Sequence, residues 1–360
     1  MDVAQYVSEL LDRAIQNRAS DIHLEPQPEG LRIRQRIDGM LLTTDVLSRS
    51  EMIPVISRIK VMGHLDIGEK RLPQDGAMSI TCGGERVDVR ISTMPTLHGE
   101  KVVLRLLRNR PEFLTLSELG LDAEDFKRLL RLIFRPHGLL IVTGPTGSGK
   151  TTTLYGILQE LNRPEVSIVT LEDPVELQIS GITQIQINTK AGLTFAQGLR
   201  AVLRQDPDLI MVGEVRDQET ADIAIRAALT GHRVFSTLHT GDAASAITRL
   251  LDMGIAPYRV ASALNGVVAQ RLVRRLCSRC RGAGCEECQY TGYWGRTGVF
   301  EVLEIDQEFQ RLIAERAPLS QVRRVFREKG FRSLEERVMD KVREGLTTRE
   351  EGLRVVEGIV

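Results

Sequence analysis

Residues 144 to 151 read Gly-Pro-Thr-Gly-Ser-Gly-Lys-Thr, a complete phosphate-binding loop. An apolar run, residues 139–142, precedes the loop, and a helix-compatible run, residues 152–158, follows it. In that strand–loop–helix context, curled backbone N–H groups and the positive helix N-terminus hold phosphate oxygens. Lys150 would reach the terminal phosphates, and the Thr151 hydroxyl would ligate Mg²⁺. The loop predicts a nucleoside triphosphate as ligand, and a glycine-rich turn with an accidental lysine is the alternative. The predicted nucleotide-binding residues are Gly144, Pro145, Thr146, Gly147, Ser148, Gly149, Lys150, Thr151 and Thr152.

Short continuous apolar runs surround the loop in the second part of the chain. Such runs, without alternation, are typical of parallel strands buried on both faces of a sheet. Helix-like segments between them predict βαβ units with the phosphate loop at the carboxyl edge of the sheet. We therefore predict an α/β domain over residues 121–360, with only helical periodicity in its last part, residues 305–360. The predicted strands are residues 139–143, 167–171, 209–212 and 234–237.

The first hundred residues follow a different pattern, because polar and apolar residues alternate in several segments. Residues 21–25 and 31–37 alternate as half-buried strands do, and Asp38-Gly39 is a hairpin turn signal. With two expected helices, these strands predict a small α+β domain over residues 1–108. Regularity breaks at Arg110-Pro111, so we predict a linker over residues 109–120. The expected helices are residues 3–17 and 52–62, and the further strands are residues 77–81, 86–92 and 101–107.

Acidic residues follow two of the predicted parallel strands. Glu214 ends the segment Asp208-Leu-Ile-Met-Val-Gly-Glu, where a carboxylate can hold Mg²⁺ through water or orient the attacking water. Glu172 lies with Asp173 and Glu176 after another strand, at the edge that faces the ligand crevice in this architecture. A carboxylate there could polarise a water molecule, although surface acids at a turn are the alternative. His239 also follows a strand and could contact the γ-phosphate, although a lone histidine is more often structural.

Four of the five cysteines fall within twelve residues, as Cys277-x2-Cys280-x4-Cys285-x2-Cys288. Two C-x-x-C pairs supply four thiolates for a tetrahedral zinc site, and a redox pair or chance clustering is the alternative. Cys82 lies in a glycine turn, far from the other four cysteines in the sequence, and is interpreted as incidental.

The composition restricts the partners of the chain. Lys plus Arg equals Asp plus Glu, at 48 each, so the net charge argues against broad nucleic-acid binding. Aromatic residues make up only 4% of the chain, which is too few to suggest base-stacking platforms. No apolar run approaches the length of a membrane span, and the N-terminus has no signal-peptide pattern. Membrane association is therefore expected only through partner proteins.

Several motifs together resemble the type II secretion and type IV pilus assembly ATPases. The phosphate loop resembles that family's loop, and the segments around Glu172, Glu214 and His239 resemble its three further nucleotide-site boxes. Ser20-Asp-Ile-His-Leu-Glu-Pro26 and Arg32-Ile-Arg-Gln-Arg-Ile-Asp-Gly39 resemble its second N-terminal domain, which is PAS-like. The resemblance extends over essentially the whole chain.

This resemblance implies a cytoplasmic, RecA-like hexamer that hydrolyses ATP, with the ATP site between the two domains. It implies that Glu172 activates water, that Glu214 is the Walker B glutamate, and that Arg90 and Arg105 present positive charge to the phosphates. Which of Glu172 and Glu214 is the base stays open. It also implies Mg²⁺ and Zn²⁺ as further cofactors, and an inner-membrane platform protein as partner, with no direct nucleic-acid partner. The motor would serve type II secretion, type IV pilus assembly or DNA uptake.

The sequence departs from the family pattern in two places. Only four residues separate the cysteine pairs, where the family usually has a longer insert. The chain also begins almost directly with the second N-terminal domain, so we expect the family's first N-terminal domain to be lacking, either naturally or by truncation. Two other functions stay open at this point: a nucleic-acid translocase on the same RecA-like core, and a nucleotide-gated module without catalysis.

Overall fold

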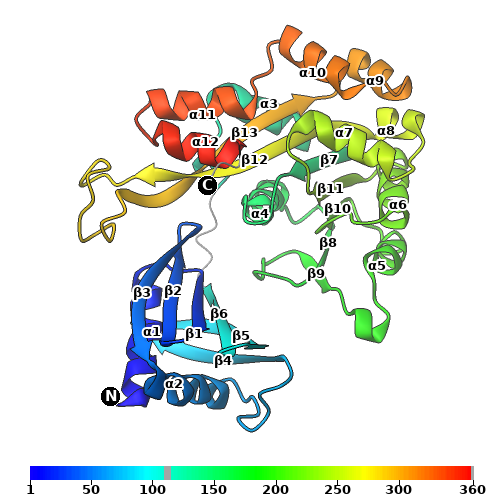
Figure 1. Cartoon of the computed structure of the whole chain (residues 1–360). Coiled ribbons are helices and arrows are strands. Elements are labelled where there is room, and N and C mark those ends of the chain that lie inside the picture. Colours follow the sequence, from blue (N-terminus) through cyan, green and yellow to red (C-terminus); the bar gives the residue numbers. More distant parts are fainter. Residues whose placement is uncertain (109–114, 358–360) are drawn as a thin grey trace. The chain divides into compact units, whose positions relative to one another are not determined.

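The computed structural model describes residues 1–108 and 115–357, and these residues form two compact units on either side of the gap. The first unit is an antiparallel sheet with the strand order β3-β2-β1-β6-β5-β4, together with two helices (Figure 1). Its elements are α1 Val3–Gln16, β1 Asp21–Gln27, β2 Gly30–Ile37, β3 Met40–Ser48, α2 Arg49–Met62, β4 Gln74–Cys82, β5 Glu85–Thr96 and β6 Gly99–Arg108.

The alternation of β1 explains how this first sheet packs. Ile22 and Leu24 are fully buried in one core cluster with Leu10 of α1 and Ile59 of α2. On the other face of the strand, Asp21 and Glu25 are buried too, because basic side chains of β2 and β6 pair with them. The predicted strands and helices of this region are present, with β4 and β5 longer than expected.

The second unit contains a seven-stranded sheet with the order β13-β12-β7-β11-β10-β8-β9. Every neighbouring pair is parallel except β12 with β13. Its strands are β7 Gly138–Thr143, β8 Ile168–Glu172, β9 Thr183–Gln186, β10 Leu209–Val212, β11 Arg233–Leu238, β12 Leu264–Leu276 and β13 Tyr293–Glu304. Its helices before β12 are α3 Ala123–Ile133, α4 Lys150–Leu161, α5 Phe195–Val202, α6 Gln218–Leu229, α7 Ala243–Asp252 and α8 Pro257–Ala263.

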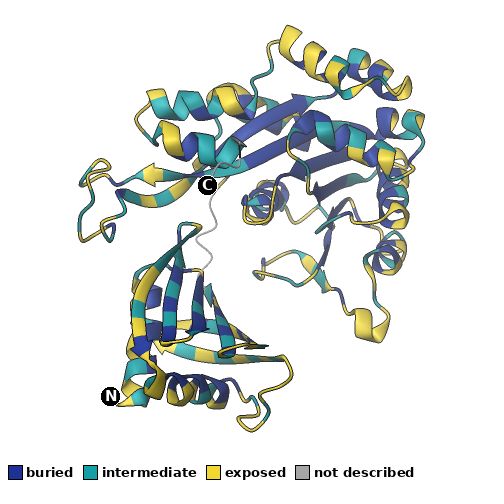
Figure 2. Cartoon of the chain, in the orientation of Figure 1, coloured by how far each residue is buried: buried dark blue, intermediate teal, exposed yellow. Residues whose placement is uncertain are grey.

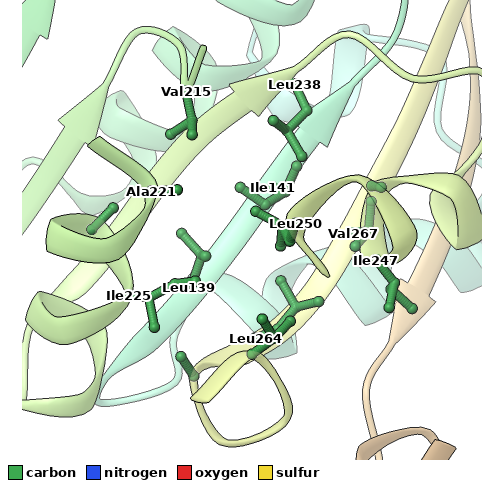
Figure 3. Close-up of a cluster of buried hydrophobic side chains, with 14 of the residues drawn as sticks. Leu139, Ile141, Val215, Ala221, Ile225, Leu238, Ile247, Leu250, Leu264 and Val267 are labelled. Atoms are coloured by element: carbon green, nitrogen blue, oxygen red, sulfur yellow. The ribbon is translucent and has the colours of Figure 1, made fainter. Parts of the chain in front are cut away.

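The central strands of this sheet are buried on both faces, as their continuous apolar sequences predict (Figure 2). Leu139 and Ile141 of β7 belong to one core cluster with Ile225 of α6 and Leu250 of α7 (Figure 3). Leu140 of β7 faces the other way, into a second cluster that also contains residues of α3 and α4. Helices therefore cover both faces, which is the RecA-like α/β arrangement predicted above.

The long hairpin of β12 and β13 was not predicted. Residues 267–269 of β12 are all buried beside β7, so this strand lacks the alternation that identifies most antiparallel strands. Figure 1 shows the hairpin extending beyond the neighbouring strands, with the cysteine segment at its turn.

Helices are the regular elements that follow β13 up to residue 357, as predicted for residues 305–360. They are α9 Gln307–Ala314, α10 Leu319–Glu328, α11 Leu334–Arg343 and α12 Arg349–Glu357, and Ser333 with Glu336 forms a capping box at α11. No helix within residues 1–108 and 115–357 is long and apolar enough to cross a membrane.

The predicted linker over residues 109–120 extends too far. Residues 109–114 lie outside the described part of the chain, whereas Leu116 and Leu119 are buried in the core cluster that contains Leu154 of α4. The 3₁₀ turn Leu116–Glu118 therefore packs as part of the second unit, because its leucines gain burial there.

Candidate ATP site and cysteine cluster

The phosphate loop joins the buried strand β7 to the first turn of α4. Gly147 and Gly149 have φ values of 78° and 87°, in the left-handed region that favours glycine. A Cβ atom on Gly144 would lie 2.5 Å from the backbone carbonyl oxygen of Gln270, so the loop also needs glycine for space there. Gly149 is the N-cap of α4 and no side chain caps this helix, which suits a helix N-terminus that binds an anion.

Lys150 lies across the loop that precedes it. Its Nζ donates to the carbonyl oxygens of Gly144 (2.8 Å) and Pro145 (3.0 Å), and the residue is only 9% exposed. Burial lowers the pKa of Lys150 to about 8, with Glu214 opposing this shift and Arg271 adding to it. The lysine is therefore a cation that two backbone carbonyl oxygens hold at the phosphate loop.

Glu214 and His239 lie close to this lysine, as the carboxyl ends of adjacent parallel strands should. The Glu214 carboxylate is 2.6 Å from Nη2 of Arg216 and 3.7 Å from Nε2 of His239. Burial and the nearby Lys150 charge lower the pKa of His239, so its ring is neutral at neutral pH. The structure thus brings together Lys150, Glu214 and His239, three of the residues predicted from the sequence.

Glu172 accepts hydrogen bonds from uncharged groups. It is 3% exposed, whereas Asp173 and Glu176 beside it are exposed. Its carboxylate accepts hydrogen bonds from the Tyr155 hydroxyl, from Thr170 Oγ1 (2.5 Å) and from Gln184 Nε2 (3.1 Å). Of the three acids Glu172, Asp173 and Glu176, only Glu172, the last residue of β8, is therefore buried.

Sequence reasoning missed the residues that hold Glu172. Tyr155 lies in the expected helix after the loop, where its position in the sequence indicates only that it belongs to the buried face of that helix. Gln184 lies on β9, a four-residue strand that was not predicted. Neither position carries a motif that would indicate a contact with Glu172.

Arg90 and Arg105 belong to the first unit, where they are cross-strand neighbours on β5 and β6. Both are exposed, and Arg105 Nε donates to Asp21 Oδ1 over 3.0 Å. The pairing of the strands explains why two arginines that are 15 residues apart in the sequence share one face of the sheet.

The four clustered cysteines lie at the turn between β12 and β13. The sulfur atoms of Cys277, Cys280, Cys285 and Cys288 are all within 4.8 Å of one another. Backbone N–H groups point at two of the sulfurs, from Gly284 to Cys280 (3.3 Å) and from Gly292 to Cys288 (3.3 Å). Four thiols in this arrangement, with N–H donors that stabilise thiolates, fit a structural zinc ion. Cys82 lies in the other unit, at the end of β4.

The loop, the buried parallel strands and the two carboxylates define a P-loop ATPase of the RecA-like class. The chain matches the family model "Type II/IV secretion system protein" over residues 1–354. The Type II secretion system ATPase E of Vibrio cholerae is 48% identical over 99% of this chain and 75% of its own length. The Type IV pilus assembly ATPase PilB of Thermus thermophilus is 44% identical over 98% of this chain and 43% of its own length.

Solved structures agree with this class. The pilus retraction motor PilT with bound ADP matches with a TM-score of 0.67 and 28% identity, covering 96% of this chain and 95% of PilT. The Legionella pneumophila ATPase DotB has a TM-score of 0.75 at 24% identity, covering 98% and 96% of the two chains, which supports the fold. This chain belongs to the type II/IV secretion system ATPase family and is an ATP hydrolase.

Proposed function

We propose that this chain is a hexameric motor that uses ATP hydrolysis to drive the assembly of a pilus or pseudopilus. The observation that carries the proposal is the match over nearly the whole chain to relatives named as type II secretion and type IV pilus assembly ATPases. The intact phosphate loop and the inward-turned Glu172 support an active rather than a purely nucleotide-gated protein.

In the proposed reaction, the loop backbone and Lys150 bind the phosphates of ATP. When ATP binds, Lys150 would exchange its hydrogen bonds to the Gly144 and Pro145 carbonyl oxygens for bonds to phosphate oxygens. The negative phosphates would then balance the positive charge of the buried lysine. The Thr151 hydroxyl and Glu214 would hold Mg²⁺, directly or through water. Bound Mg²⁺ supplies positive charge to the β- and γ-phosphates.

Glu172 is proposed as the residue that activates the attacking water. The donors that hold its carboxylate are uncharged: two hydroxyl groups and one side-chain amide. A carboxylate offers about four lone-pair sites, and three donors leave about one site for a water molecule. Glu214, in contrast, has Arg216 at 2.6 Å and lies in the field of Lys150, which suits a role close to the metal and phosphates.

Positive charge for the transition state is proposed to come from Arg90 and Arg105. Their exposed guanidinium groups could stabilise charge on the transferred phosphoryl group. His239, neutral and exposed beside Glu214, is proposed to donate a hydrogen bond to the γ-phosphate. The four cysteines would hold zinc as a structural ion that closes the β12–β13 turn.

The proposed working form is a homo-hexamer on the cytoplasmic side of the inner membrane, attached through a polytopic platform protein. Light scattering of the purified chain with Mg²⁺ and a non-hydrolysable ATP analogue should give six times the mass of one chain. A stable monomer or dimer under these conditions would contradict the motor assembly. ATP hydrolysis that rises strongly with single-stranded DNA would instead favour a nucleic-acid translocase.

A further inference from the structure

A buried tyrosine connects the helix after the phosphate loop to Glu172. Tyr155 is 3% exposed and lies five residues after Lys150 on α4. Its hydroxyl donates to Glu172 Oε2 and lies 3.3 Å from the backbone nitrogen of Glu176. One hydroxyl group thus joins α4, the end of β8 and the chain that follows β8.

Gln184 completes this arrangement from the neighbouring strand β9. Its Nε2 donates to Glu172 Oε1 (3.1 Å) and to the carbonyl oxygen of Leu177 (2.9 Å). Its Oε1 accepts from the backbone nitrogen of Ile179 (2.7 Å). Each carboxylate oxygen of Glu172 therefore has a separate fixed donor, and both donors also bind the 176–179 backbone.

We propose that Tyr155 is a positioning residue, whose hydroxyl fixes the Glu172 carboxylate relative to the first turns of α4. Those turns carry Lys150 and Thr151, so a shift of α4 would be transmitted to Glu172 through one hydrogen bond. This inference rests on the proposed water-activating role of Glu172. The ring alone could fill the buried space, so the hydroxyl is the part of Tyr155 that this role requires.

Two details support positioning over simple packing. The hydrogen bond from the Tyr155 hydroxyl is charge-assisted, because its acceptor is a carboxylate. Charge-assisted hydrogen bonds are stronger than hydrogen bonds between neutral groups. Burial and the Glu172 carboxylate raise the pKa of Tyr155, so the hydroxyl keeps its proton and stays a donor. Thr170 Oγ1 binds the same carboxylate from β8 itself and cannot relate it to α4.

The test is Tyr155→Phe in the full chain, with steady-state ATP hydrolysis measured from pH 5.5 to 9. We expect kcat to fall about tenfold to hundredfold, while KM for ATP changes less than about threefold. Because a donor to the charged carboxylate is lost, the acid limb of the kcat profile should move to higher pH. A purely structural role would lower melting temperature without moving that limb.

A matched control removes a hydroxyl elsewhere in the same unit. The hydroxyl of Tyr293, the first residue of β13, lies 2.9 Å from Thr348 Oγ1. Tyr293→Phe should therefore leave kcat and its pH profile unchanged. Gln184→Met removes the donor to the other oxygen and should shift the acid limb in the same direction. It keeps the inference testable if Tyr155→Phe folds poorly, because an unmoved limb in Gln184→Met would then overturn it.

A double-mutant comparison separates this inference from the function on which it rests. In the Glu172→Gln background, adding Tyr155→Phe should lower the residual rate by less than about twofold. If Glu172→Gln is inactive but Tyr155→Phe has wild-type kcat and pH profile, the positioning role is wrong and the role of Glu172 stands. If Glu172→Gln keeps wild-type turnover, the proposed role of Glu172 fails, and the positioning role fails with it.

Discussion

The carboxyl ends of β8 and β10 carry the same kind of residue in very different surroundings. The two strands are parallel neighbours, with Leu171 paired to Val212, so Glu172 and Glu214 both follow one edge of the sheet. Glu172 is held by uncharged donors in a buried site. Glu214 has a guanidinium at 2.6 Å and the Lys150 charge nearby.

The difference teaches that two acids at the same edge of one sheet can take separate parts of one reaction. A carboxylate held by neutral donors is suited to accept a proton from water. A carboxylate among cations balances charge and suits the region where phosphates and a metal ion gather. The sequence contains both acids, but only the tertiary contacts distinguish them.

Among the variants that probe the surroundings of Glu214, the largest effect is expected from replacing Glu214 itself. Glu214→Gln should lower kcat about 10²–10⁴-fold, because one of the two carboxylates of the reaction is lost. If Glu214 acts through the metal, this variant should also need more Mg²⁺ for half-maximal activity, whereas Glu172→Gln should not. Titrating Mg²⁺ in ATPase assays of both variants measures this difference.

The exposed Glu176, in the same acidic segment as Glu172, is the matched control for these substitutions. Glu176→Gln should keep wild-type activity and Mg²⁺ dependence, because its side chain is exposed. The proposed division of roles would be contradicted if Glu172→Gln and Glu214→Gln shifted the Mg²⁺ dependence equally.

The next effect concerns the positive charge of Lys150, which interacts with Glu214. Because the pKa of Lys150 is lowered to about 8, the free protein loses this proton as pH rises above 8, whereas bound phosphate favours the charged lysine. Binding then requires proton uptake, so ATP affinity should fall by up to about tenfold per pH unit above 8. Titration with a fluorescent ATP analogue between pH 7 and 9.5 measures the slope.

Lys150→Arg is the control for this pH effect, because arginine stays protonated throughout that range. Its affinity for ATP is expected to be weaker but nearly constant from pH 7 to 9.5. A similar decline in both proteins would show that Lys150 does not cause the pH dependence.

The smallest effect is expected from His239, which lies beside Glu214 and not beside Glu172. Its ring nitrogen is 3.7 Å from the carboxylate and its side chain is half exposed, so the contact is weak. His239→Ala should lower kcat about twofold to fivefold, in ATPase assays beside the exposed control His137→Ala. A loss as large as that of Glu214→Gln would instead give His239 a direct part in the chemistry.

Much of the second unit followed from its sequence, because continuous apolar strands and the phosphate loop are local patterns. The hairpin of β12 and β13 did not, since residues 267–269 are buried together beside β7 and show no alternation. Both Glu172 and Glu214 were candidates from the sequence, but their roles could not be separated. The contact of Tyr155 with Glu172 joins residues on different elements, and no periodicity encodes such a contact.

The phosphate loop of the ATPase is tested most directly by one substitution, Lys150→Ala, with hydrolysis and thermal unfolding measured on the same preparation. The account predicts no detectable ATP hydrolysis, with a cooperative unfolding transition like that of the wild-type chain. Wild-type turnover in Lys150→Ala would contradict it, because hydrolysis would then not depend on the loop from Gly144 to Thr151.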